Sequence, residues 1–129
     1  MKAYTDISQS KKLAEILPLE SADMWWNFYS VTTDDTTPQI IHLDIPWVGN
    51  FNWDNKSDNI PCWSLAALLD VLQKTAYFID EDANVVLSSY KTVEWNLGIN
   101  NSDVELVTES NPVDACYEMI IKLHEQKLL

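Results

Sequence analysis

The segment 46–59 gathers the aromatic and polar side chains that this sequence offers for recognition. Trp47, Phe51 and Trp53 alternate there with asparagines and with Asp54. Aromatic faces beside amide and carboxylate groups are the chemistry of a sugar or small-ligand site, in which stacking supplies contact area and hydrogen bonds fix direction. The same rings could instead cover the open face of a sheet or line a homo-oligomer contact. We take Trp47, Phe51, Trp53 and Asp54 as the candidate binding residues.

Nucleophilic and metal chemistry have weaker support from the residue types. The chain has two cysteines, Cys62 and Cys116, and two histidines, His42 and His124. A reactive cysteine needs a nearby base and a family signature, neither of which the sequence offers, so both thiols are expected to be buried, reduced and structural. His42 lacks the further ligands of a zinc site, and the acidic turn 80–82 lacks the glycine and spacing of an EF-hand loop. We therefore predict no catalytic residue, no cofactor and no metal site, and we favour a non-enzymatic protein.

The charge of the chain is strongly one-sided. Twenty acidic residues face eight lysines, arginine is absent, and the net charge is −12. A chain without a basic stripe is a poor partner for a phosphate backbone, so direct binding of nucleic acid is not expected. Two interpretations stay open: the charge keeps the protein soluble, or the acidic surface imitates nucleic acid and occupies a DNA-binding protein.

Length and composition predict one folded domain over residues 1–129. A chain of this size with 47% hydrophobic residues can bury a core without disulfide or metal staples. No apolar run approaches the roughly 20 residues that span a bilayer, and the first residues show no signal-peptide pattern. The expected compartment is the cytoplasm, with no membrane partner.

The elements that position these residues are helices alternating with short strands. A first helix is predicted from Thr5 or Asp6 to Pro18, because Asp6 and Gln9 have the spacing of a capping box. Asn111 followed by Pro112 marks the start of a C-terminal helix. Between them we predict strands 25–31 and 39–45, a buried helix 61–72, and strands 75–79, 85–90, 93–97 and 104–108.

This order of elements predicts an α+β fold. A small antiparallel sheet, made of a hairpin and a meander, is expected to pack against about three helices, including a buried central helix. The segment 46–59 is then a long connection at the surface, where recognition residues are often found.

Three segments, 9–24, 60–72 and 111–129, together resemble a family of small uncharacterised proteins encoded in phages and mobile elements of gut Bacteroides-type bacteria. The segments begin at Gln9, Ile60 and Asn111 and cover less than half of the chain. The resemblance implies a bacterial or phage cytoplasm. Because no activity is assigned to that family, it implies no functional residue.

The sequence therefore favours a non-enzymatic accessory domain that binds an unknown protein partner. One alternative is a small-ligand or carbohydrate-binding module that uses Trp47 and Trp53. Another is an acidic DNA mimic that inhibits a DNA-binding protein. Catalytic motifs are missing while aromatic residues are abundant, with six tryptophans, and this contrast favours binding over catalysis.

Overall fold

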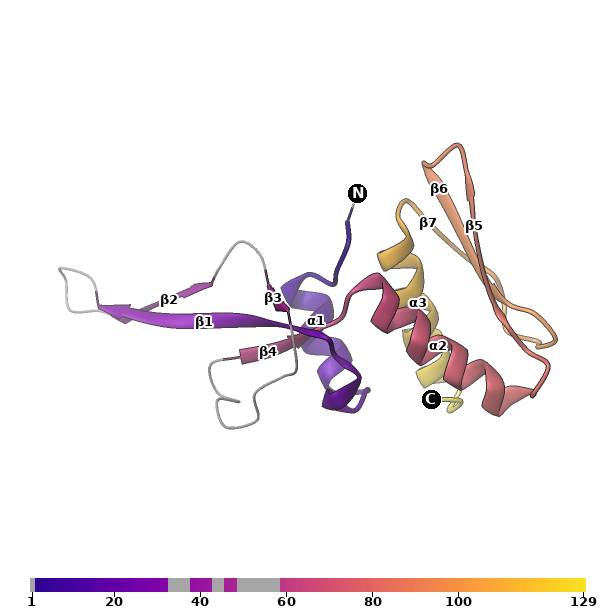
Figure 1. The fold of residues 1–129 in the computed structure, drawn as a ribbon, viewed down its shortest axis with the longest axis horizontal. Helices are drawn as coiled ribbons and strands as arrows, with labels where there is room; N and C mark the ends of the chain where they lie inside the picture. The colour runs from indigo at the N-terminus through magenta and orange to yellow at the C-terminus, as the bar shows by residue number, and fades with distance from the viewer. Residues whose placement is uncertain (1, 33–37, 43–45, 49–58) are drawn as a thin grey trace. The chain divides into compact units, whose positions relative to one another are not determined.

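The computed structural model describes residues 2–32, 38–42, 46–48 and 59–129. Over these residues the protein has three α-helices and two small antiparallel sheets, so the predicted α+β class is confirmed. The chain divides into two compact units (Figure 1). Residues 6–63 form the N-terminal unit, and residues 1–5 with 64–129 form the C-terminal unit. The single domain over residues 1–129 stays a prediction.

The first helix of the N-terminal unit, α1 (Ile7–Ala14), begins at the predicted capping box. The Asp6 carboxylate accepts a hydrogen bond from the Gln9 N–H at 2.8 Å, and the Gln9 side-chain oxygen accepts one from the Asp6 N–H at 3.2 Å. These two bonds satisfy amide groups that the first turn of a helix leaves without partners. The apolar face of the helix places Leu13 fully in the core.

The strands of this unit form a four-stranded sheet in the described part of the chain. β1 (Met24–Thr32) pairs antiparallel with β2 (Pro38–His42), which confirms the predicted hairpin. The first half of β1 also pairs with β3 (Trp47–Val48) and with β4 (Asn59–Cys62). α1 packs against β4, so the helix covers this end of the sheet.

Trp63 closes the core of the N-terminal unit. Its side chain is fully buried, and the indole N–H donates to the hydroxyl oxygen of Ser21 at 2.9 Å. Ser21 lies in a short 3₁₀ helix, η1 (Leu19–Ser21), and its hydroxyl donates to the Pro18 carbonyl at 2.6 Å. A buried indole thus keeps a hydrogen-bond partner, as large polar-tipped aromatics require.

The central helix, α2 (Leu65–Ile79), begins later than predicted and extends further. Ser64 is its N-cap and accepts a hydrogen bond from the Ala67 N–H at 3.2 Å, whereas the residues just before it pair as β4. The predicted strand 75–79 is wrong, because these residues are the last turns of α2. No helix breaker occurs within the segment 65–79, so the helix continues despite several β-branched and aromatic residues.

Burial of α2 is confined to one face. The buried residues are Leu68, Leu72, Thr75 and Ala76. The exposed residues are Ala66, Asp70, Gln73, Lys74, Tyr77 and Phe78. The Gln73 side chain fixes the strand that follows the helix, because its amide donates to the Ala83 carbonyl at 3.3 Å and accepts from the Val85 N–H at 3.1 Å.

The C-terminal unit contains the predicted meander. Its strands lie in the order β5 (Val85–Tyr90), β6 (Glu94–Ile99) and β7 (Val107–Glu109), with antiparallel pairing throughout. The meander and the hairpin form two separate sheets, whereas the sequence predicted one. The described residues of β1 pair only with β2, β3 and β4, and the strands of the meander pair only with one another.

The last helix, α3 (Pro112–Glu125), begins at the predicted residue. The Asn111 side chain accepts a hydrogen bond from the Asp114 N–H at 2.9 Å, with Pro112 in the first turn. α3 packs against α2, β6 and β7, and the sheet lies over the two helices in Figure 1. Its buried residues are Pro112, Val113, Ala115, Cys116, Met119, Ile120 and Leu123.

Candidate functional site

The binding residues that the sequence predicts lie mainly outside the described residues. Phe51, Trp53 and Asp54 belong to the segment 49–58, and of Trp47 only the backbone is described. That backbone belongs to β3, in which Trp47 pairs with Trp25 of β1. A recognition site in this segment therefore stays a prediction.

Both cysteines are buried, and neither forms a disulfide in the described part of the chain. Cys62 lies at the end of β4 and not in the first turn of the central helix, where the sequence placed it, because that helix begins at residue 65. Cys116 faces the core from α3, and burial raises its pKa from 9.0 to about 12 by desolvating the thiolate. A thiol that holds its proton so tightly is not a nucleophile near neutral pH.

Other groups that could carry catalysis or bind a metal are dispersed in the described part of the chain. No three His, Cys, Asp or Glu side chains there are arranged to hold a metal ion. His124 is exposed, with Nδ1 at 3.1 Å from the Leu129 carbonyl oxygen. None of the helices formed by the described residues has the length and apolarity that crossing a membrane requires.

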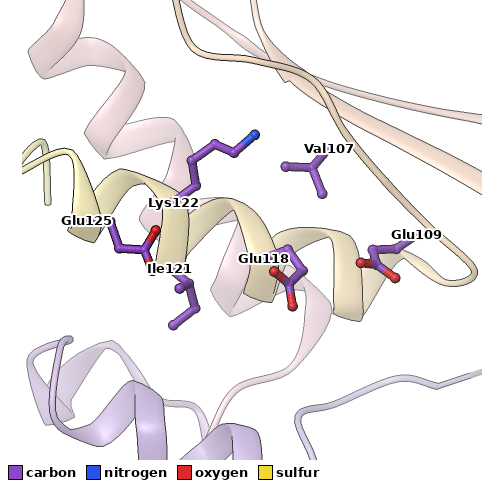
Figure 2. Close-up of a pocket in the computed structure, with 6 residues that line it drawn as sticks. All are labelled: Val107, Glu109, Glu118, Ile121, Lys122 and Glu125. Atoms are coloured by element: carbon purple, nitrogen blue, oxygen red, sulfur yellow. The ribbon is translucent and has the colours of Figure 1, made fainter.

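A groove between β7 and α3 brings together charged side chains from two elements. It has a volume of about 270 Å³, and we call it the acidic groove. Two apolar side chains, Val107 and Ile121, line it together with four charged ones, Glu109, Glu118, Lys122 and Glu125. Figure 2 shows Glu109 beside the start of α3, Glu118 midway along the helix and Glu125 at its end.

The charge in the acidic groove is not neutralised within it. The Lys122 ammonium points toward the Val107 side in Figure 2 and lies 3.7 Å from a carboxylate oxygen of Glu105. The three acidic residues that line the groove, Glu109, Glu118 and Glu125, form no ion pair with any described residue. The groove therefore presents three uncompensated carboxylates together with two apolar side chains.

A second hollow lies on the face of the meander that carries Gly98. It has a volume of about 250 Å³ and is lined by small, polar and apolar residues of β5, β6 and the connection before β7. Leu106, which is 60% exposed, lies over Gly98, and a methyl group added to Gly98 would meet it at 3.1 Å. This hollow is shallow and holds no charged side chain, so it offers apolar contact without direction.

The acidic groove is a site that the sequence analysis missed. Glu118 and Glu125 are seven residues apart with Ile121 between them, which is the spacing of one helix face, and this pattern was available in the sequence. Glu109 had no such signal, because only the packing of β7 against α3 brings it beside the helix.

Comparisons with protein-family models, with curated proteins and with solved structures give no match for this chain.

Proposed function

We propose that this protein is a non-catalytic binding domain whose acidic groove holds a lysine- or arginine-bearing segment of a partner protein. The observation that carries the proposal is the set of three carboxylates between β7 and α3 that form no ion pair with a described residue and share the groove with Val107 and Ile121. The carboxylates attract positively charged side chains, and Val107 and Ile121 favour a partner that also offers an apolar group.

The net charge of −12 acts on the same encounter. A strongly negative protein attracts basic partners over a distance and raises their association rate, an effect that falls with ionic strength. Each exposed ion pair contributes only about 0.2–1 kcal/mol. The charges therefore orient the partner and raise its association rate, while apolar contact with Val107 and Ile121 lowers its dissociation rate.

Two further roles stay as alternatives. A small-ligand or carbohydrate site on Trp47 and Trp53 rests on residues whose side chains are not described. Mimicry of nucleic acid uses the same acidic surface, with a DNA-binding protein as the partner, and it predicts that DNA competes for that partner. The same proposal includes the cytoplasm as the compartment, and a phage or mobile-element origin. Two cysteines that form no disulfide support a reducing compartment.

The test is a titration with two labelled peptides, one of lysine alone and one of lysine with leucines at helical spacing. We expect the leucine-bearing peptide to bind more tightly, because its leucines also contact Val107 and Ile121. The double variant Glu118→Gln/Glu125→Gln removes two rim charges, and at about 0.2–1 kcal/mol each the Kd should rise roughly two- to thirty-fold.

The matched control is Glu81→Gln/Glu94→Gln. Both residues are exposed, neither lines the acidic groove, and the double variant has the same net charge as the test variant. We expect this control to weaken the peptide much less than the groove variant does. Equal weakening by both double variants would mean that the peptide responds to net charge alone, and the proposal would then be wrong.

A further inference from the structure

A groove in the N-terminal unit lies between α1 and the outer side of β4, elements that Figure 1 shows close together. Its volume is about 460 Å³, within the range of about 300–1,000 Å³ that small-molecule sites occupy. Four apolar side chains form most of its surface, namely Ala14, Leu19, Ile60 and Pro61. The exposed side chains of Lys11 and Glu15 lie at its rim.

Asn59 is the remaining residue that lines this groove, and it is unusual for its burial. Its side chain is only 7% exposed, yet its amide oxygen accepts no hydrogen bond from any described residue. It lies at the first position of β4, opposite Asn27 of β1. Buried polar groups in proteins are nearly always paired, so an acceptor left over beside a groove requires an explanation.

Leaving the acceptor unpaired destabilises the free protein, because the oxygen has lost water without gaining a donor. A leucine of similar size would avoid that loss. A structural role for the side-chain oxygen would show itself as a hydrogen bond from the protein, and none is present among the described residues. A bound molecule that supplies a donor would recover the lost bond.

We propose that the α1–β4 groove binds a small, mainly apolar molecule that donates one N–H or O–H group to the side-chain oxygen of Asn59. The apolar walls bury the body of the ligand, and the amide fixes its orientation, which is the usual division of roles in a ligand pocket. The oxygen is itself hidden from water, so the ligand reaches it with a small shift of groove side chains. Lys11 is long, exposed and without an ion pair to any described residue, which permits such a shift.

This site is independent of the acidic groove, which belongs to the C-terminal unit. The described residues that line the α1–β4 groove do not include any of the candidate binding residues named from the sequence.

Indole and 1-methylindole form a matched pair of probes, because they share the apolar ring and differ in the N–H donor. Titration of the isotope-labelled protein with each, followed by amide NMR, should shift the signals of α1 and β4. We expect indole to bind about tenfold more tightly, the equivalent of roughly 1.4 kcal/mol for one hydrogen bond to a buried acceptor. Equal affinities for the two probes, or shifts confined to other elements, would overturn the proposal.

The variant Asn59→Leu tests the acceptor itself. It should remove the preference for indole over 1-methylindole while leaving the melting temperature unchanged or higher, since no hydrogen bond to the described protein is lost. A clearly lower melting temperature would show that Asn59 has a structural partner and would refute the inference.

The variant Ala14→Phe tests the groove independently of the amide. A ring at residue 14 fills the space between α1 and β4, so both probes should lose binding. The control is Ala66→Phe, the same substitution at an exposed alanine of α2 in the other unit, which should leave both affinities unchanged. Retention of indole binding by Ala14→Phe would contradict the location of the site.

Discussion

Leu68 and Leu69 are neighbouring leucines of α2 that should differ sharply in what they contribute to stability. Leu68 is fully buried against the core of the C-terminal unit, whereas Leu69 is only half-buried. Replacing leucine by alanine removes buried carbon atoms worth about 0.8 kcal/mol each, which gives roughly 2.4 kcal/mol when all of them are enclosed. The cavity that remains adds a further cost where the surroundings do not relax.

For Leu68→Ala both costs apply, and we expect a loss of about 2–5 kcal/mol. For Leu69→Ala solvent already reaches part of the side chain, so no closed cavity forms and the loss should be about 1 kcal/mol. With a urea dependence of roughly 1–3 kcal/mol per molar, a 3 kcal/mol loss lowers the midpoint by about 1–3 M.

Far-UV circular dichroism during urea unfolding is the suitable assay. The C-terminal unit holds α2 and α3, of 15 and 14 residues, whereas the N-terminal unit holds α1, of 8 residues, so the helical signal follows mainly the C-terminal unit. If Leu69→Ala lowered stability as much as Leu68→Ala, α2 would be buried all round and not on one face only.

Two further predictions concern the turn after β5 and the buried thiol. Lys91 and Thr92 have φ angles of 54° and 59°, a left-handed conformation that costs a β-branched residue about 1–2 kcal/mol. Thr92→Gly should therefore raise the stability measured in thermal melts by up to about 1 kcal/mol, whereas Thr92→Ala should change it little. The pKa of Cys116 is raised from 9.0 to about 12, so native protein should resist iodoacetamide at that residue while urea-unfolded protein is labelled, as mass spectrometry can show. The folded protein binds the Cys116 thiol proton more tightly than the unfolded chain does, so the stability that the protonated thiol contributes is complete below about pH 9 and is lost as the pH rises toward 12. A free energy of unfolding that stays constant over this range would contradict the assignment.

The sequence by itself determined the features that depend on neighbouring residues. The caps at Asp6 and Asn111 form as predicted, because each is a hydrogen bond between residues three apart that needs no other part of the chain. The hairpin and the meander also follow from local alternation and turn residues, and so does the α+β class. These signals lie within a window of a few residues, where propensity and pattern act directly.

Only the tertiary structure decided the features that join distant segments. The segment 75–79 has the composition of a strand, but Thr75 and Ala76 are buried when it continues α2, and packing outweighs the local preference. The division into two sheets depends on strand pairing, since β1 pairs with β2, β3 and β4 while β6 pairs with β5 and β7. Glu109 joins the acidic groove because β7 packs against the helix that follows it, and Asn59 becomes a buried acceptor where α1 meets β4, elements far apart in the chain. No local pattern encodes either contact.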